Sequence, residues 1–527
     1  MAAEVERLKL QVKKLTILRF GKKSERLTVD ETIQLALALD ATEEQAKAKD
    51  PEVPHAPAPS ESVEDAANRE PPAAQPDPPE QARPKKKRPN HPGRTKLAPH
   101  IERVVMPEVK VPAEQRACCA CGGEMTCVTH VVHERVEFVP AKIVVYEEPR
   151  EKLACRNSAC RKDIVTAPRP GGEGPRRRAG ASLFAHLIES KCDDGMPIDR
   201  QRDQLHRLGF DIPINTLYTY WTHATKLLLP VAEVLRARVL ADPIVRVDDT
   251  ALSVLDKTHK SGIYKGHLWV FAGVGPLVAY TFTKGWSADQ ISPYLSMIDG
   301  FIQCDDYKGY ATHITLPDGT KRMLVDPARR LGCMMHVRRR FHEALKLGDK
   351  RAARGIELIG ALYEIERILK DGGANAEQRL ELRTDFSLPL LDAFEAWVDQ
   401  LTPRTLPRSP LGEALGYARH QRTYVRRCFT DGRFEIDNGL AERILREPCS
   451  GRKAYLFTGS EKAAHRLAGA YSLVQSCRQL GISTREYLID VLNKLDAGWP
   501  LRRIHELVPD QWARLHGPLA QAAHAQQ

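Results

Sequence analysis

Two pairs of adjacent aspartates are the residues of this chain best suited to chemistry. Apolar and β-branched runs at residues 244–247 and 301–303 predict two strands, which lead into Asp248-Asp249 and Cys304-Asp305-Asp306. If the strands are neighbours, the carboxylates converge, and Mg²⁺ prefers a few carboxylates together with water and phosphate oxygens. A strand-end aspartate is also an ordinary turn residue, so neither pair alone indicates catalysis.

A third acid for such a site is expected between residues 431 and 447. A helix is predicted to begin near Asn438, and Glu442 follows its start. Glu435, Asp437 and Glu447 lie close by and compete with Glu442. Spacing alone therefore predicts a third carboxylate without choosing it.

The elements that must position these acids alternate between strands and helices. Runs at 267–272 and 278–283 predict two further strands, and residues 288–298 predict a helix. Helical spacing recurs between the second aspartate pair and the third acid, which predicts a helical insertion over about 342–430. We therefore expect a mixed sheet surrounded by helices, within a multidomain α+β protein.

Upstream, two cysteine pairs have the spacing of a zinc site. Cys118-x-x-Cys121 and Cys155-x4-Cys160 flank a segment with strand-like alternation, and four thiolates on tight turns bind Zn²⁺ tetrahedrally. Such a zinc would be structural, because four cysteines leave no position open for water. Cys119 and Cys127 are possible substitutes, and unrelated buried thiols are the alternative reading.

Residues 182–229 have the periodicity of three short helices. Gly209 suits the end of the second helix and Asn215 suits the N-cap of the third. A helix-turn-helix would present Thr216, Thr219 and His223 to a major groove. A three-helix bundle without DNA contact fits the same pattern.

The first hundred residues contain three segments of different composition. Residues 4–18 carry an apolar seam that fits either a plain amphipathic helix or a short zipper. Residues 51–80 are rich in proline and predict a disordered linker. The following basic run predicts either a solvated tail or contact with a phosphate backbone, through Lys85, Lys86, Lys87 and Arg88.

Composition limits the class of protein. The length of 527 residues predicts several domains, and 79 basic against 68 acidic residues favour a polyanionic partner such as nucleic acid. No apolar stretch approaches a membrane span and the first residues do not resemble a signal peptide, so we expect a cytoplasmic protein, nucleoid-associated when bound to DNA. Twelve cysteines in so long a chain are no disulfide scaffold.

Cys333-x-x-His336 precedes a basic stretch. The pair could ligate a metal or form a nucleophile pair, or it could be a packed thiol with a hydrogen-bonded imidazole steadying the edge of the site. Some of the surrounding cationic residues are expected to contact phosphate. The candidates are Arg338, Arg339, Arg340, Arg422, Arg426, Arg427, Arg443, Arg446, Arg452 and Lys453.

Several of these motifs together resemble the DDE transposases of the insertion-sequence-66 family, from the first helix almost to the C-terminus. Asp248-Asp249-Thr250 is similar to the family's Asp-Glu-Thr, and Asp305-Asp306-Tyr307-x-x-Tyr310 to its Asp-Gly-Tyr-x-x-Tyr. Further similar segments are Phe20–Leu27, Met196–Gln201, the Cys333–Phe341 block, Asp437-Asn438-x-x-x-Glu442-Arg443 and Gly451-Arg452-Lys453. Departures such as Gly439, where a second asparagine is usual, touch no candidate metal ligand.

The resemblance implies a ribonuclease H-like core with a two-metal mechanism. Asp248, Asp305 and Glu442 would be catalytic and would hold two Mg²⁺ or Mn²⁺ ions, with Cys333, His336 and Asn438 in support. The expected partners are the terminal inverted repeats of the element and target DNA, a second copy of the chain, and possible accessory proteins of the same element. A non-catalytic regulatory relative and a structure-selective nuclease are the alternatives.

The implied domain order follows the chain. The expected units are an N-terminal helical segment (1–50), a linker (51–100), a zinc module (101–170), a helix-turn-helix-like domain (171–240), the catalytic core (241–460) and a C-terminal helical domain (461–527).

Overall fold

The computed structural model describes residues 142–147, 151–154, 164–166, 179–315 and 319–516. The predicted N-terminal helix, the linker, the basic run and all the candidate zinc ligands lie outside these ranges. The first described elements are two short antiparallel strands, β1 (Lys152–Ala154) and β2 (Ile164–Thr166).

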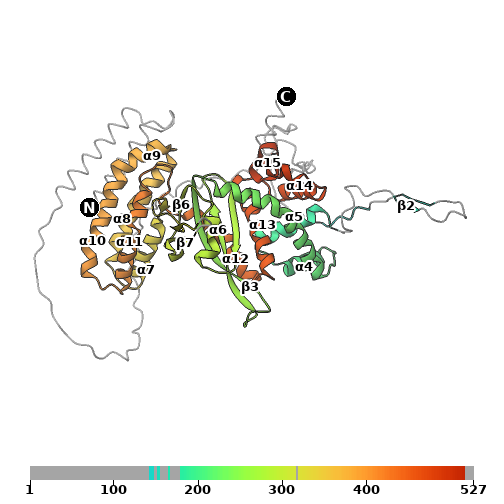
Figure 1. Cartoon of the computed structure of the whole chain (residues 1–527), viewed down its shortest axis with the longest axis horizontal. Coiled ribbons are helices and arrows are strands. Elements are labelled where there is room, and N and C mark those ends of the chain that lie inside the picture. The colour runs from blue at the N-terminus through green and yellow to red at the C-terminus, as the bar shows by residue number, and fades with distance from the viewer. Residues whose placement is uncertain (1–141, 148–150, 155–163, 167–178, 316–318, 517–527) are drawn as a thin grey trace, which may run out of the picture. The chain divides into compact units, whose positions relative to one another are not determined.

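A five-stranded mixed sheet occupies the middle of the described chain (Figure 1). β3 (Ile244–Leu255), β4 (Ile263–Ala272) and β5 (Val278–Thr283) form an antiparallel meander, while β6 (Phe301–Gln303) and β9 (Arg330–Leu331) continue it on the other side of β3 in parallel pairing. The strand order is β5-β4-β3-β6-β9. The expected mixed sheet is confirmed.

One strand is longer than its apolar run predicted. The run at 244–247 is only the first part of β3, so Asp248 lies inside a strand and not at its end. The prediction was wrong because β4 pairs with β3 from Arg246 to Leu255, and these ladder hydrogen bonds hold the polar residues extended. The parallel pairing with β6 does stop at Arg246.

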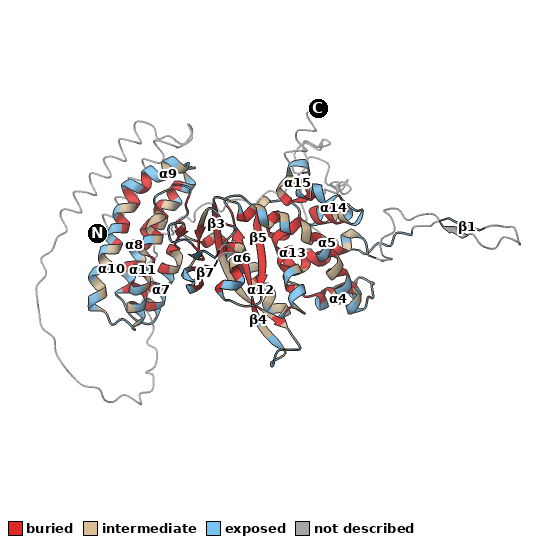
Figure 2. Cartoon of the chain, in the orientation of Figure 1, coloured by how far each residue is buried: buried red, intermediate tan, exposed pale blue. Residues whose placement is uncertain are grey.

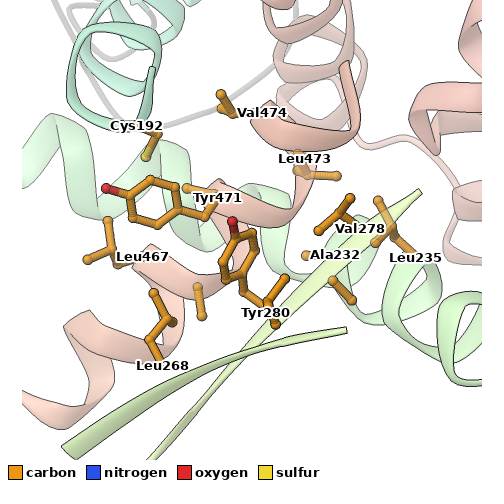
Figure 3. Close-up of a cluster of buried hydrophobic side chains, with 14 of the residues drawn as sticks. Cys192, Ala232, Leu235, Leu268, Val278, Tyr280, Leu467, Tyr471, Leu473 and Val474 are labelled. Atoms are coloured by element: carbon orange, nitrogen blue, oxygen red, sulfur yellow. The ribbon is translucent and has the colours of Figure 1, made fainter. Parts of the chain in front are cut away.

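Helices cover the edge strand β5 and bury its whole length. α3 (Ala181–Cys192), α5 (Ile214–Leu240) and α13 (Glu461–Leu480) contribute to the core against it, where Tyr280 packs against Tyr471 (Figure 3). The outer edge of β5 is also satisfied by helix hydroxyls, since the Tyr280 N–H donates to Ser472 Oγ at 2.7 Å. A helix thus replaces the missing neighbour strand.

The three helices expected over 182–229 are present, with α4 (Ile198–Arg207) between α3 and α5. Gly209 has a φ of +83° just after α4, as predicted for a residue ending a helix. The predicted N-cap was wrong: Pro213 occupies the N-cap position of α5, and Asn215 lies within the first turn of that helix. The expected short third helix was also wrong, because α5 continues to Leu240 and its second half packs against the sheet.

The predicted helical insertion is present and has its own hydrophobic core. Its helices are α7 (Met334–Lys346), α8 (Ala352–Asp371), α9 (Ala376–Leu382), α10 (Leu388–Leu401) and α11 (Pro410–Arg427). Each helix buries one face and exposes the other (Figure 2).

After the insertion the chain returns to the sheet. α12 (Gly439–Tyr455) packs against β3, and α13 is followed by α14 (Thr484–Asp496) and α15 (Pro509–His516). Between β5 and β9 lie α6 (Ala288–Leu295), the 3-10 turn η2 (Lys308–Ala311), and the hairpin β7 (His313–Thr315) and β8 (Lys321–Met323). No helix of the described part of the chain is both long and apolar enough to span a membrane.

Candidate active site

Asp248 and Asp305 lie at the same level of two paired strands. The last parallel pair of β3 and β6 is Arg246 with Gln303, and each aspartate stands two residues beyond its member of that pair. Residues two apart in a strand share a face of the sheet. The aspartates are held by nearby backbone: the Asp249 N–H donates to Asp248 Oδ1 at 2.9 Å, and the Tyr307 N–H donates to Asp305 Oδ1 at 3.1 Å.

The third candidate acid, Glu442, lies in the first turn of α12. The helix begins at Asn438, as predicted, but the asparagine side chain does not cap the helix. It is fully buried, and its Nδ2 donates to the Val247 carbonyl at 2.8 Å, directly before Asp248. Its backbone N–H donates to Cys333 Sγ at 3.2 Å. Asn438 therefore ties the start of α12 to β3 and to the start of α7.

The three carboxylates affect one another electrostatically. Burial, together with the negative charges of Asp305 and Glu442 and against the hydrogen bond from Asp249, raises the pKa of Asp248 to about 7. Burial also raises the pKa of Asp305, while His336 opposes that rise. Carboxylates that raise one another's pKa in this way favour a bound cation.

Cys333 and His336 lie beside Glu442. One ligand atom from each of these three residues lies within 4.8 Å of the other two, and no other group of this kind is found among the described residues; Asp248, Asp305 and Glu442 are not as close together as this. The His336 Nε2 is 3.5 Å from Glu442 Oε1, and Arg339 Nη2 donates to Glu442 Oε2 at 2.8 Å. Burial lowers the pKa of His336 and raises the pKa of the Cys333 thiol far above its usual range.

The second aspartate of each pair has other partners. Asp249 Oδ2 lies 2.6 Å from His267 Nδ1, and its Oδ1 accepts a hydrogen bond from Trp286 Nε1 at 3.0 Å. Asp306 lies 3.2 Å from the guanidinium of Arg330. These contacts give Asp249 and Asp306 partners other than those of Asp248 and Asp305, a distinction that only the family resemblance had predicted.

The three acids that competed with Glu442 are each engaged elsewhere. Glu435 pairs with Arg379 at 3.2 Å, and Glu447 pairs with Arg478 at 2.9 Å. Asp437 accepts hydrogen bonds from the Tyr363 hydroxyl at 2.6 Å and from the backbone of α12. Of these four acids, only Glu442 is among the main causes of the raised pKa of Asp248.

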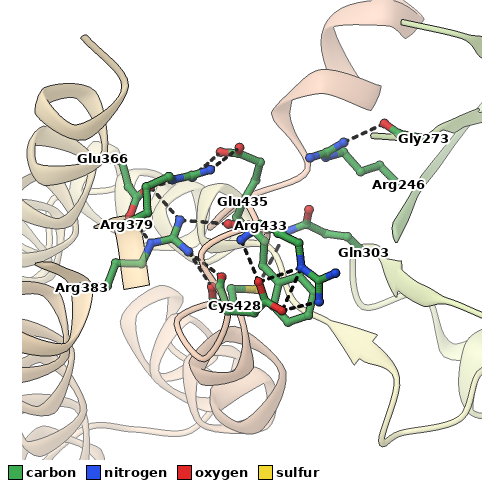
Figure 4. A network of polar contacts seen from close by, with 11 residues as sticks. Arg246, Gly273, Gln303, Glu366, Arg379, Arg383, Cys428, Arg433 and Glu435 are labelled. Carbon is green, nitrogen blue, oxygen red and sulfur yellow. Dashed lines mark hydrogen bonds and ion pairs between the residues drawn. The ribbon is translucent and has the colours of Figure 1, made fainter. Parts of the chain in front are cut away.

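A buried polar network holds the loop that leads into α12 (Figure 4). The Arg383 guanidinium is fully buried, forms a bidentate ion pair with Glu366 at 2.7 Å, and donates to the carbonyls of Cys428, Asp431 and Phe434. From β6, Gln303 Nε2 donates to the Glu435 carbonyl at 2.7 Å. The network therefore fixes the insertion and the loop at residues 428–435 relative to the sheet.

The cationic residues predicted to contact DNA have different surroundings. Arg338, Arg443 and Lys453 are exposed. Arg339 is bound to Glu442, and Arg452 Nη1 donates to the Thr250 hydroxyl at 2.6 Å and so braces α12 against β3. Lys85, Lys86, Lys87 and Arg88 lie outside the described residues.

Other cationic candidates pair with acids within the insertion. Arg422 lies 2.6 Å from Asp399, and Arg426 contacts Glu395 at 3.0 Å. A surface groove of about 580 Å³ on the insertion is lined by Arg340, Arg419 and His420 among others.

The residues predicted to face a major groove are only partly available. Thr219 is exposed, but its hydroxyl donates to the Asn215 carbonyl at 2.8 Å. His223 packs against the ring of Phe184, with its Nε2 3.5 Å from Asp496. Thr216 is half-buried.

Comparison with known proteins identifies the family. The model of the "Transposase IS66 family" matches residues 176–466, which is more than half of the chain. A "zinc-finger binding domain of transposase IS66" matches residues 115–157, and a "Transposase C of IS166 homeodomain" matches residues 7–106. The zinc-finger match includes Cys118, Cys121 and Cys155 and ends before Cys160.

Similar proteins include two from Sinorhizobium fredii (strain NBRC 101917 / NGR234). The uncharacterized protein y4qI is 30% identical over 78% of this chain and 76% of its own length. The uncharacterized protein y4jD is 28% identical over 79% of this chain and 81% of its own. Among solved structures, the Drosophila P element transposase strand transfer complex matches 57% of this chain and 93% of that chain, with 13% identity and a TM-score of 0.27. The chain belongs to the IS66 family of transposases.

Proposed function

We propose that Asp248, Asp305 and Glu442 are the catalytic residues of this transposase, in a ribonuclease H-like core. The observation that carries the proposal is their electrostatic coupling, since the charges of Asp305 and Glu442 help to raise the pKa of Asp248 to about 7. The elements of the fold that carry these three acids also support the proposal. Asp248 lies in β3, Asp305 follows the end of β6, which pairs with β3 in parallel, and Glu442 lies in the first turn of a later helix, as the family resemblance implies.

The donor set fits a hard divalent cation. All three residues offer carboxylate oxygens, and Glu442 Oε1 is buried without a hydrogen-bond partner within the described chain. Asp248, Asp305 and Glu442 would hold two Mg²⁺ or Mn²⁺ ions. When bound, such ions activate water or a DNA 3′-hydroxyl and stabilise the leaving oxygen of an in-line displacement.

The protein's own residues orient these carboxylates before DNA arrives. Arg339 Nη2 donates to Glu442 Oε2, while Glu442 Oε1 lies 3.5 Å from His336 Nε2. Asn438 holds the start of the helix that carries Glu442. Arg330 Nη2 donates to the backbone carbonyl of Asp305 at 2.6 Å. His336 itself is half-buried beside the site. Such preorganisation avoids reorganisation at the moment of reaction.

We assign DNA recognition to the N-terminal half and to the cationic surface. Cys118, Cys121, Cys155 and Cys160 are proposed as the ligands of the structural zinc. The expected order of domains is retained as a proposal, although α3–α5 share one hydrophobic core with the sheet. The proposed substrates are the terminal inverted repeats of the element and a target DNA, bound by a homo-oligomer with accessory proteins where the element encodes them.

The test is cleavage of a plasmid that carries the gene with its native flanks. Wild type, Asp305→Asn and Asp248→Asn are compared in Mg²⁺, Mn²⁺ and EDTA, with Asp306→Asn as the matched control because Asp306 is paired with Arg330. We expect metal-dependent breaks at the element's ends in wild type and the control, and none in the two other variants. Breaks without preference for the ends would indicate a structure-selective nuclease. End binding without breaks, even with accessory proteins added, would indicate a regulatory protein.

A further inference from the structure

An exposed aromatic side chain stands beside the candidate active site. Trp286, in the short loop between β5 and α6, is 50% exposed. Its ring stacks with Tyr307 at 4.5 Å between centroids and 27° between planes, and with His267 at 5.6 Å and 11°. We call these three residues the aromatic platform. An indole combines a large apolar face with a polar N–H, and here that N–H is already bonded while half of the side chain stays exposed.

The platform is held in place by polar contacts. The Trp286 Nε1 donates to Asp249 Oδ1 at 3.0 Å, and His267 Nδ1 lies 2.6 Å from the other oxygen of the same carboxylate. The Tyr307 hydroxyl donates to the Trp286 carbonyl. Gly309 is needed beneath the tyrosine, because a Cβ there would lie 2.1 Å from the Tyr307 ring. These contacts hold the indole against both neighbouring rings while half of its surface stays exposed.

The platform is joined to the proposed catalytic residues on both sides. Asp249 follows Asp248 in β3, and the N–H of Tyr307 donates to Asp305 Oδ1 at 3.1 Å. Lys308, next to Tyr307 in the sequence, is exposed, while Lys284 pairs with Glu461 at 3.8 Å. Flat rings fit a nucleotide better than an apolar peptide, because bases stack on aromatic faces, and an exposed lysine attracts phosphate.

We propose that the aromatic platform stacks an unpaired DNA base next to the phosphodiester that is cleaved, an inference that rests on the proposed function. A base leaving the duplex exchanges its stacking on neighbouring bases for stacking on a protein ring. The platform would thereby hold the strand distorted at the point where Asp248 and Asp305 act. Its ligand class is a single extrahelical or unpaired nucleotide, and it reads no particular sequence.

The test compares two probes of the same 30-base-pair sequence, one blunt and one with four unpaired thymidines at a 3′ end. Dissociation constants are measured in EDTA for full-length wild type, Trp286→Ala and Trp286→Phe. The ratio of the two constants cancels DNA contacts made elsewhere on the chain. Because stacking one base on an aromatic ring changes affinity by about 5- to 150-fold, we expect wild type to prefer the overhang by a factor in this range.

Trp286→Ala should lose that preference while binding blunt DNA as wild type does. Trp286→Phe keeps an aromatic face and loses the hydrogen bond to Asp249, so it should retain most of the preference. An unchanged ratio in Trp286→Ala would overturn the proposal, as would an equal loss in Trp286→Phe, which would assign Trp286 to holding Asp249. Circular dichroism checks that each variant is folded.

Plasmid cleavage by the same wild-type preparation separates the two levels of inference. Cleavage at the element's ends together with an unchanged ratio in Trp286→Ala refutes the platform alone. Absence of metal-dependent cleavage by wild type, with the accessory proteins of the element added, refutes the proposed function, whatever the ratio is.

Discussion

Asn438 offers the sharpest test of how the fold positions Glu442. Its side chain is fully buried, and its Nδ2 donates to the Val247 carbonyl at 2.8 Å. Asn438 also occupies the N-cap position of α12, the helix that carries Glu442. Asn438→Ala removes this donor and leaves the carbonyl buried without it. Leaving a buried acceptor unpaired costs about 1–3 kcal/mol, so we expect a loss of unfolding free energy in this range.

The same substitution should slow cleavage beyond its effect on stability. Without the link to β3, the start of α12 can shift relative to Asp248, and a displacement on the order of 1 Å in a catalytic group can cost on the order of 100-fold in rate. Stability is measured as the shift of the urea midpoint by circular dichroism. Cleavage is measured as the nicking rate at the element's ends, well below the melting temperature.

Asn375 provides a matched control. It is also an asparagine at the start of a helix, but its exposed side chain forms a capping box with Gln378 in the insertion. Asn375→Ala should cost about 1 kcal/mol and leave the nicking rate unchanged. Wild-type nicking by Asn438→Ala, despite its lower stability, would refute the argument that this hydrogen bond positions Glu442. A loss of unfolding free energy well below about 1 kcal/mol in Asn438→Ala would refute the magnitude worked from burial.

Three further outcomes are expected. Arg383→Met should lower the unfolding free energy by about 3–5 kcal/mol, because it leaves Glu366 and three backbone carbonyls without their buried donor, whereas Arg379→Met should cost less; urea midpoints compare them. Burial lowers the pKa of Lys191 to about 8, so the unfolded chain binds more protons between that pH and about 10 and stability should rise with pH there; Lys191→Met should flatten that rise in melting curves. Purified protein should contain one zinc per chain by elemental analysis, and Cys118→Ser should contain substantially less; equal zinc in both would exclude Cys118 as a ligand.

The sequence by itself determined the elements and the chemical class. The runs that became β5 and β6 have the predicted ends, because both are short apolar runs bounded by polar and turn residues. Helical spacing likewise predicted the insertion between Asp305 and Glu442. The order of motifs predicted the family, which the comparisons confirm.

Only the tertiary structure decided which side chains meet. Composition and spacing could not rank Asp248 against Asp249, and only the family resemblance chose between them, because their different surroundings depend on which strands pair with β3 and in what register. Spacing likewise could not show that Cys333 and His336 approach Glu442 from another helix far away in the chain. Trp286 gave no signal at all, since a single tryptophan in a loop has no periodicity. Such contacts depend on side-chain directions fixed by long-range packing, and local patterns of residues do not contain that information.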